Sequence, residues 1–262
     1  MTASPTPHPD AGLGEILADI VEEAAALILP FWKSELEVVQ KADSSPVTEA
    51  DRAGERLILQ RLAERFPGVR VVSEEHASEF GTPDAIGPRF LLVDPVDGTK
   101  AFVRGDPNFT VNIGLIDNHR PVAGAVCAPA TGEIWLTTSK GAMKRRFDAA
   151  ALEPVHVRPW RDGEAVALVS HTMKEETAAK LAAQYGFSFR EAMDSSIKLV
   201  RIAEGAADIY PRHGPTSEWD IAAGHAVLEA AGGSLTTPEG EPVVYGKAAD
   251  RFLNGWFVAR GG

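Results

Sequence analysis

Two carboxylates stand three residues apart in the segment Asp94–Thr99, which reads DPVDGT and directly follows the apolar run Leu91–Val93. Two anions at the end of a buried strand repel each other unless a positive charge lies between them. Oxygen ligands without a neighbouring Cys or His pair suit Mg²⁺ or Mn²⁺ better than zinc. The spacing therefore predicts that Asp94 and Asp97 bind a divalent cation. The alternative is an Asp-rich turn in which an aspartate only caps the next helix.

The residues between and after these two acids fit the same interpretation. Pro95 stiffens the turn, and the backbone carbonyl of Val96 is a further oxygen that could bind the cation. Gly98 and Thr99 then begin a short predicted helix. The free N–H groups at such a helix start favour a phosphate group.

Three further acidic signals occur at the ends of predicted elements. Glu74 and Glu75 follow the apolar segment 69–73, and Asp51 stands three residues after Thr48 in a helix-capping pattern. Asp220 lies in the first turn of an apolar helix, where the helix dipole favours an acid. Each of these signals also has an explanation without a metal, namely a solvated turn, a helix cap or the helix dipole. Together with the first segment, they favour one shared metal site.

Several of these acidic residues are expected to lie on helices. Apolar residues recur at helical spacing between Leu13 and Phe31, and Pro30 is expected to loosen the last turn. A second helix is predicted from Thr48 to Phe66, where Pro-Gly follows, and residues 41–46 before it are predicted to form a loop. His225, on the apolar face of the helix that carries Asp220, is predicted to be a packed histidine and not a ligand.

The remaining pattern divides the chain into two halves. In the first half we predict strands over residues 69–75, 89–94, 109–116, 121–129 and 132–138. Residues 152–164, rich in Pro and charge, are the candidate domain boundary. Strands and helices then alternate over residues 165–170, 174–186, 187–192, 195–205, 207–211 and 217–233. The prediction is an α/β protein with an α+β N-terminal half and an α/β C-terminal half.

Composition narrows the classes of function. The chain has 262 residues and a net charge of −11, which argues against binding a nucleic acid polymer. The single cysteine, Cys127, suits a reducing compartment, and no apolar run approaches the roughly 20 residues of a membrane span. Residues 1–12 lack the features of a secretory signal and are predicted to be a disordered lead-in. We therefore expect a cytoplasmic protein.

Taken together, the acidic motifs resemble a known family. DPVDGT, with EE upstream at 74–75 and WDIAAG downstream at 219–224, is similar to the inositol monophosphatase superfamily of metal-dependent, lithium-sensitive phosphatases. The longer segments 41–51, 97–116, 195–226 and 252–257 resemble the 3'(2'),5'-bisphosphate nucleotidases of that superfamily, and the resemblance runs from about Leu13 to Phe257.

The resemblance implies both a fold and an activity. The fold would be the five-layer αβαβα sandwich of the inositol monophosphatase and fructose-1,6-bisphosphatase type. Its domains would cover residues 13–150, with most metal ligands, and 151–262, with the site between them. The activity would be removal of the 3'-phosphate from adenosine 3',5'-bisphosphate, a by-product of sulfate assimilation, to give AMP and phosphate.

The resemblance also implies roles for the acidic residues. Glu74, Asp94 and the Val96 carbonyl would hold one Mg²⁺. Asp94, Asp97 and Asp220 would hold a second, and Glu75 would lie nearby or beside a weaker third ion. Mn²⁺ could substitute for Mg²⁺.

Other matched residues would act on the water and on the phosphate. Asp51 and Thr99, with Glu74, would order and deprotonate the attacking water. The N–H groups of Gly98 and Thr99 would hold the phosphate.

The substrate side of the site is less sharply defined. The matched segments imply that the substrate contacts are Gly98, Thr99, Ser170, His171, Ser195, Ser196, Lys198, Arg212 and Asp220. Lys198 and Arg212 suit a second phosphate. Their structural alternatives are a helix lysine that reaches solvent and a surface salt bridge.

Some residues depart from the nucleotidase pattern and leave the substrate open. Asp194 stands where a glycine is expected, Ala101 replaces a common glutamate, and GDPN at 105–108 stands where NGE is usual. The alternatives are an inositol monophosphatase or another sugar or amino-alcohol phosphate phosphatase, and a non-catalytic sensor that binds adenosine bisphosphate. The expected partner is a small phosphorylated molecule, and the chain is expected to be a monomer or a homodimer.

Overall fold

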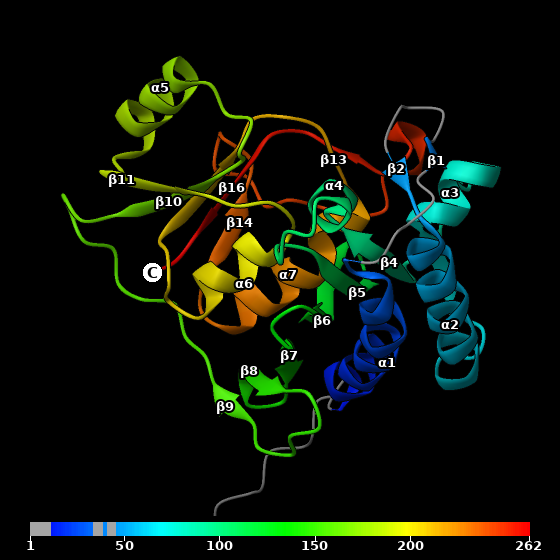
Figure 1. Ribbon diagram of the computed structural model, residues 1–262. Helices are drawn as coiled ribbons and strands as arrows, with labels where there is room; N and C mark the ends of the chain where they lie inside the picture. The colour runs from blue at the N-terminus through cyan, green and yellow to red at the C-terminus, as the bar shows by residue number, and fades with distance from the viewer. Residues whose placement is uncertain (1–11, 34–38, 41–45) are drawn as a thin grey trace, which may run out of the picture.

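The computed structural model describes residues 12–33, 39–40 and 46–262. Residues 1–11 of the predicted lead-in and residues 41–45 of the predicted loop lie outside the described residues. Figure 1 shows the arrangement of the helices and strands. The first sheet has seven strands in the order β3-β4-β5-β6-β7-β8-β9. Their bounds are Arg70–Ser73, Arg89–Asp97, Thr110–Asp117, Arg120–Ala128, Glu133–Thr138, Gly141–Arg146 and Glu153–Pro154.

Strand β4 sets the position of the two central acids. It runs parallel to β3 and antiparallel to β5, and its residues Leu91 to Val93 are fully buried. The strand was predicted to end at Asp94, but it continues to Asp97. Its pairing with β5 shifts register between these two acids, because Pro95 has no N–H for the ladder and the strand bulges there. Both acids therefore belong to one irregular strand end.

The two helices predicted in the first part of the chain cover one face of this sheet. Helix α1, Leu13–Ile28, runs on into a 3₁₀ turn, Leu29–Phe31, because Pro30 lacks the N–H for the α-helical bond. Helix α2, Glu49–Arg65, is capped by Thr48, which forms the predicted capping pattern with Asp51. Side chains of both helices pack in one core with alternate residues of β4, β5 and β6.

The second sheet has five strands in the order β11-β10-β12-β16-β14. Strands β11 and β12 are parallel to β10, whereas β16 is antiparallel to β12 and β14. The bounds of β10, β11, β12, β14 and β16 are Val166–Val169, Phe189–Ala192, Ile209–Arg212, Ser234–Thr236 and Phe257–Arg260. Helix α5, Glu175–Tyr185, ends at Gly186 and buries Leu181 against Val169 and Ile209. The alternation of strands and helices predicted after residue 164 is confirmed.

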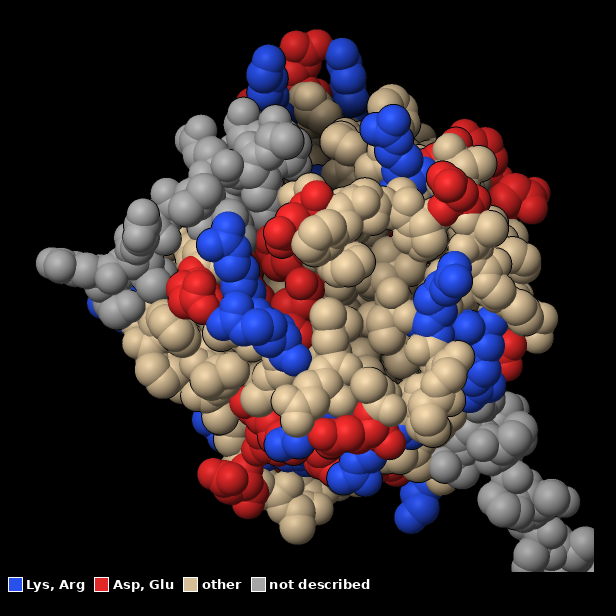
Figure 2. All heavy atoms as spheres, turned by 90° about the vertical axis from the view of Figure 1, so that its right-hand side faces the viewer, with Lys and Arg blue, Asp and Glu red and all other residues tan. Residues whose placement is uncertain are grey.

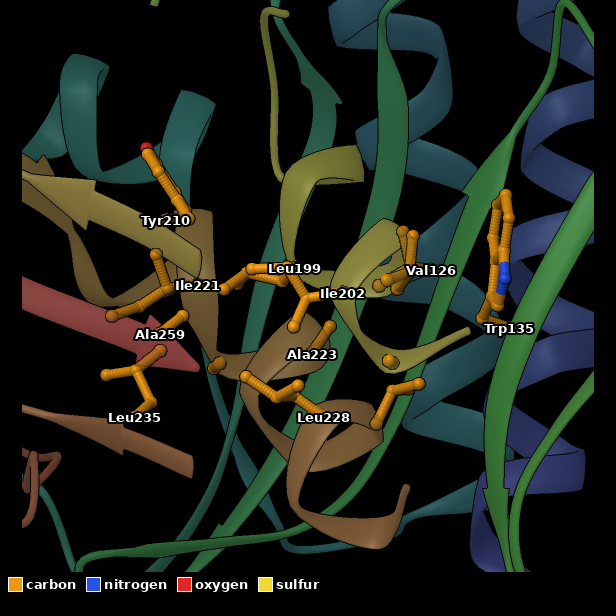
Figure 3. Packing of buried hydrophobic residues seen from close by; sticks show 14 of the residues in the cluster. Val126, Trp135, Leu199, Ile202, Tyr210, Ile221, Ala223, Leu228, Leu235 and Ala259 are labelled. Carbon is orange, nitrogen blue, oxygen red and sulfur yellow. The ribbon is translucent and has the colours of Figure 1, made fainter. Parts of the chain in front are cut away.

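Helices α6, Ile197–Ala203, and α7, Glu218–Ala230, lie between the two sheets. Figure 3 shows Leu199 of α6 and Leu228 of α7 packed together, with Val126 of the first sheet on one side and Ala259 of the second on the other. The order of layers is α1 and α2, first sheet, α6 and α7, second sheet, α5. The predicted five-layer αβαβα sandwich is confirmed.

Short elements complete the fold near the strand ends. The sequence did not predict helix α3, Glu74–Phe80, and a short helix α4, Thr99–Val103, follows Gly98 as expected. Two small antiparallel pairs join β1 to β2 and β13 to β15. The bounds of β1, β2, β13 and β15 are Val39–Gln40, Pro46–Val47, Thr216–Ser217 and Leu253–Asn254, and a 3₁₀ turn covers Ala248–Asp250.

The division of the chain into domains at residue 150 stays a prediction. Strand β9 lies just beyond residue 150 and still pairs with β8 of the first sheet. Helices α6 and α7, from the second half of the chain, share one core with the first sheet. The two halves are therefore packed across a continuous apolar interface.

The surface agrees with the acidic composition. Figure 2 shows acidic and basic side chains interspersed on the face that carries α2 and α3, without a continuous basic surface among the described residues there. Within the described part of the chain, no helix combines the length and the apolar character that a membrane span requires.

Candidate active site

Three carboxylates from three elements meet beside the end of β4. Glu74 is the first residue of α3, Asp94 lies in β4, and Asp220 lies in the first turn of α7. One carboxylate oxygen from each lies within 4.8 Å of the other two. The sequence placed these three acids at element ends, and the structure brings them together. Such a set of hard oxygen donors fits a divalent cation.

Asp97 lies next to this cluster, and residues of the loop before α6 bind its carboxylate. Its Oδ2 accepts a hydrogen bond from the Ser195 hydroxyl, 3.0 Å away, and another from the Ser196 N–H. Burial raises the pKa of Asp97, although nearby Lys198 lowers it in part. A fourth carboxylate is thus oriented at the edge of the cluster by the loop before α6.

The pKa of Asp220 shows the effect of burial and of the neighbouring carboxylates. Burial raises the pKa of Asp220 well above its ordinary value, and the charges of Asp97 and Glu74 raise it further. A bound cation reverses this effect, because it favours the ionised form of every carboxylate around it. The acidic residues present therefore fit a metal ion.

Local hydrogen bonds to the backbone fix the carboxylates of Asp220 and Asp94. Asp220 Oδ2 accepts a hydrogen bond from the Ser217 N–H at 2.8 Å, which also starts α7. Asp94 Oδ1 accepts the Val96 N–H at 3.0 Å, which closes the bulge of β4. One oxygen of each carboxylate is used in this way, and the acids are positioned by local backbone geometry.

Glu55 of α2 is a buried acid to which the sequence analysis gave no role. Its Oε1 accepts the N–H groups of Glu75 and His76, both at 3.1 Å. Ser73, which precedes α3, makes no side-chain cap of its own. Glu55 therefore takes the place of a local cap and fixes the helix turn that presents Glu74. The sequence signal that could have identified Glu55 is its position four residues after Asp51, which puts both acids on the same face of α2.

Asp51 and Thr99 form the pair that the resemblance implied. The Thr99 hydroxyl lies 3.3 Å from Asp51 Oδ1 and 3.1 Å from the Val96 carbonyl, and it can donate to either. Asp51 Oδ2 accepts the Thr48 hydroxyl and N–H. The capping role of Asp51 and its contact with Thr99 are both present, since each uses a different oxygen.

Gly98 makes the sharp turn between β4 and α4. Its φ of 92° lies in the left-handed region, and a Cβ there would lie 3.0 Å from the Asn108 carbonyl and 3.2 Å from the Ser195 Cβ. A side chain would therefore be strained and crowded. The glycine lets the Thr99 hydroxyl reach Asp51 directly after the strand ends.

A small hydrogen-bond network supports Asp97 from behind. The Ser195 and Ser196 hydroxyls lie 2.7 and 2.9 Å from the Thr110 hydroxyl, and Ser196 also donates to Asn112 Oδ1 at 2.9 Å. Thr110 and Asn112 lie on β5, opposite Asp97 and Asp94. Neither β5 residue was singled out from the sequence. Ser196 is buried and is engaged in this network.

Asp97 and Asp220 line a cleft of about 560 Å³ between the two halves of the chain. Its lining includes the predicted substrate residues Gly98, Ser170, His171, Ser195, Ser196, Lys198, Arg212 and Asp220. Thr99, Asp51 and Glu74 lie beside the cleft and are not part of its lining. A second opening, which Glu74 and Asp220 line from the side of α3, reaches the cluster.

The two predicted phosphate-binding cations are placed differently. Lys198 is only 3% exposed, and its ammonium donates to the Met193 carbonyl at 3.1 Å and the Ser195 carbonyl at 2.6 Å. Burial lowers the pKa of Lys198 to about 8, although Asp97 opposes this shift. Arg212 donates to the Pro215 carbonyl at 3.0 Å and leaves its Nε without a partner among the described residues.

Comparison with known proteins identifies this arrangement. Residues 13–254 match the model of the inositol monophosphatase family. The chain belongs to the inositol monophosphatase family. Within it, the chain is 38% identical over 222 residues to the 3'(2'),5'-bisphosphate nucleotidase CysQ of Escherichia coli, which covers 85% of this chain and 88% of the relative. A CysQ protein of Buchnera aphidicola is 32% identical and covers 93% of this chain and 91% of its own.

Solved structures of family members agree with the fold. CysQ from Bacteroides thetaiotaomicron has a TM-score of 0.76 at 30% identity and covers 95% of this chain and 97% of its own. The inositol monophosphatase from Anabaena has a TM-score of 0.74 at 24% identity, over 95% of this chain and 90% of its own, and supports the fold alone.

Proposed function

We propose that this protein is a Mg²⁺-dependent phosphatase that removes the 3'-phosphate of adenosine 3',5'-bisphosphate. The observation that carries the proposal is the cluster of Glu74, Asp94 and Asp220 at the edge of a cleft that also contains exposed cations. The curated relatives named 3'(2'),5'-bisphosphate nucleotidase favour a nucleotide over an inositol phosphate as the substrate.

The proposed metal ligands are the residues inferred from the sequence. Glu74, Asp94, Asp97, Asp220 and the Val96 carbonyl would hold two Mg²⁺ ions, with Glu75 near a weaker third. When bound, Mg²⁺ would supply positive charge that makes a water more acidic and stabilises the leaving oxygen. Phosphate monoesters hydrolyse extremely slowly without a catalyst, so this stabilisation is what the reaction needs most.

The Asp51 and Thr99 pair is proposed to orient and deprotonate the attacking water. The Thr99 hydroxyl can donate to Asp51 Oδ1, 3.3 Å away, so its oxygen can accept a hydrogen bond from the attacking water. Asp51 is buried and fixed by Thr48, which keeps the pair in one orientation. Glu74, which lines the second opening to the cluster, would hold the other hydrogen of the water.

The remaining cleft residues are proposed to hold the rest of the substrate. The N–H groups of Gly98 and Thr99 would bind the phosphate that is removed. Arg212, His171 and Ser170 would bind the nucleotide and its second phosphate. Lys198 would act by fixing the loop that carries Ser195, since two carbonyls of this loop already bind its ammonium. A cytoplasmic location and a monomeric or homodimeric state are part of the same proposal.

Phosphate release by the purified protein tests the function. Adenosine 3',5'-bisphosphate and myo-inositol 1-phosphate are compared, each with Mg²⁺ and each with excess chelator. We expect Mg²⁺-dependent release with a strong preference for the nucleotide. A preference for the inositol phosphate would keep the metal site but overturn the substrate, in favour of the inositol monophosphatase alternative. Tight nucleotide binding without release would favour the sensor.

A further inference from the structure

Three side chains that line the cleft, and that belong neither to the acidic cluster nor to the Asp51 and Thr99 pair, are in polar contact around one carboxylate. They are Arg104, His171 and Asp194, and we name them the cleft triad. Arg104 follows α4, His171 follows β10, and Asp194 precedes α6. The triad therefore joins three segments that are far apart in the sequence.

Asp194 is the centre of the triad. Its Oδ2 lies 2.8 Å from Arg104 Nη2, and its Oδ1 lies 3.3 Å from His171 Nδ1. The side chain of Asp194 is 22% exposed, whereas Arg104 and His171 are 53% and 44% exposed. The two basic side chains thus remain open to solvent in the cleft, while the carboxylate between them is largely covered.

The position of Asp194 is fixed by the rest of its loop. The Lys198 ammonium holds the carbonyls of Met193 and Ser195, the two neighbours of Asp194. Ser195 has a φ of 64° in the left-handed region and donates to Asp97. The carboxylate of Asp194 is therefore held in the cleft by a loop that is anchored at both neighbours.

A carboxylate between two basic groups occupies the place where a second anionic group of the substrate would bind. A phosphate that binds the Nη2 group of Arg104 must displace Asp194 from it, and it is also repelled by the charge of that carboxylate. Arginine pairs with phosphate more strongly than an exposed ion pair holds its partners, so the exchange is possible but is opposed. A glycine at this position would offer no such opposition.

We propose that Asp194 is a specificity-determining residue that weakens the binding of a second phosphate by holding Arg104 and His171. The inference rests on the proposed function, because it takes a doubly phosphorylated nucleotide as the substrate. It adds that Arg104 contacts the second phosphate once it is released from Asp194. Asp194 therefore narrows the difference in affinity between bisphosphate and monophosphate nucleotides.

The test is a comparison of KM for two nucleotides in Asp194→Asn and in the unaltered protein. The nucleotides are adenosine 3',5'-bisphosphate and adenosine 3'-monophosphate, which lacks the second phosphate. We expect the KM for the bisphosphate to fall about two- to fivefold, the range expected when one exposed ion pair is removed. The KM for the monophosphate should not change. An unchanged or higher KM for the bisphosphate, or an equal fall for both, overturns the inference.

Two further variants sharpen the result. Arg104→Gln should raise the KM for the bisphosphate and leave the KM for the monophosphate unchanged. Asp106→Asn is the matched control, since Asp106 also lines the cleft but its carboxylate accepts its hydrogen bonds from Asn108 of its own loop. A fall in KM in this control as large as that in Asp194→Asn would indicate a general charge effect and would overturn the inference.

A second measurement separates this inference from the proposed function. The inhibition constant of AMP, which keeps only the second phosphate, should fall in Asp194→Asn and in Asp194→Gly. If the unaltered protein releases no phosphate from the bisphosphate, the proposed function fails and the inference fails with it. If the unaltered protein releases phosphate but the inhibition constant of AMP in both variants equals that of the unaltered protein, only the inference fails.

Discussion

At the scale of single residues, the site depends on side chains that use their two polar atoms for different tasks. Asp51 accepts a hydrogen bond from Thr48 through one oxygen and can accept one from the Thr99 hydroxyl through the other. Asp220 caps its own helix through one oxygen and can use the other for a cation. A residue with a convincing structural role can therefore still be functional, because a carboxylate has two oxygens.

Removing the Thr99 hydroxyl tests the proposed role of this pair. Thr99→Val keeps the shape of the side chain but leaves the attacking water without its oriented acceptor. We expect kcat for adenosine 3',5'-bisphosphate to fall by about 10²- to 10⁴-fold, with little change in the affinity for Mn²⁺ measured by titration. Thr172→Val, in the same cleft, is the control and should keep its kcat. A kcat near that of the unaltered protein would exclude Thr99 from the reaction.

At the scale of elements, short helices present the acids only because other elements hold them. Helix α3 has seven residues and lacks a side-chain cap from Ser73. Glu55 supplies the missing acceptor from α2, about 20 residues away in the chain. Its carboxylate therefore connects the packing of α2 to the position of Glu74.

Glu55 variants test this connection. Glu55→Leu removes the acceptor of the Glu75 and His76 N–H groups, the first of which is buried. This should cost about 1–3 kcal/mol of unfolding free energy and weaken Mn²⁺ binding about 10- to 100-fold. Glu55→Gln keeps a carbonyl oxygen and should have a smaller effect on both. Urea unfolding and Mn²⁺ titration measure them, with the exposed Glu49→Leu as control. Equal metal affinity in all three variants would show that Glu55 does not position Glu74.

The second sheet has its own buried acid, Asp208, which directly precedes β12 and lies beside the first residue of β10. Asp208 accepts hydrogen bonds from Arg158 Nε at 2.7 Å and from the Val166 N–H at 2.6 Å. Burial acts to raise the pKa of Asp208, but the hydrogen bonds from Arg158 and Val166 outweigh it and hold the pKa below its usual value. The ionised form thus ties the segment after β9 to the sheet.

The stability that Asp208 contributes should depend on pH. Because its pKa is lowered in the folded protein, the contribution is present above about pH 4, the ordinary pKa, and is lost as the pH falls through the folded value. Asp208→Asn turns an amide toward these donors and should cost about 2 kcal/mol at pH 7. Urea unfolding from pH 7 to below pH 4 should show the difference shrinking, with the exposed Asp84→Asn unaffected. A difference that stays constant over this range contradicts the assignment.

At the scale of the whole molecule, the site lies where the two halves of the chain meet. Glu74 and Asp94 come from the first half and Asp220 from the second. Helix α7 carries Asp220 and packs on the first sheet at Gly114 and Gly124, where a Cβ would lie within 3.0 Å of the helix. The distance between the sheet and α7 therefore sets the distance between these acids.

Widening this contact tests the dependence of the site on the layer packing. In Gly114→Ala the new Cβ would lie 2.8 Å from the Ala222 Cβ and 2.9 Å from the Ala223 nitrogen, so α7 must move. We expect a loss of about 1–3 kcal/mol in unfolding free energy and weaker Mn²⁺ binding. Gly87→Ala, where a Cβ would meet nothing within 4 Å, is the control. Unchanged metal affinity in Gly114→Ala would show that the cluster tolerates movement of α7.

Much of the fold was predictable from local patterns. Apolar periodicity predicted α1, and the Thr48 start together with the Pro-Gly after Phe66 predicted α2. Glycines predicted the ends of α5 and α7. The start of α3 was not predicted, because its cap comes from Glu55 and not from a neighbouring residue. Strand β4 was predicted too short, since the bulge that carries it past Pro95 depends on its partner β5.

The amino-acid sequence by itself determined which acids could form the site, because capping patterns, the helix dipole and buried strand ends are local effects. It also determined the family, through motifs spread over most of the chain. Only the tertiary structure decided that Lys198 is buried against its own loop, that Ser196 supports Asp97, and that Asp194 pairs with Arg104. The physical reason is that these contacts join segments far apart in the chain, or depend on how they pack, and no spacing within one segment encodes the distance between two.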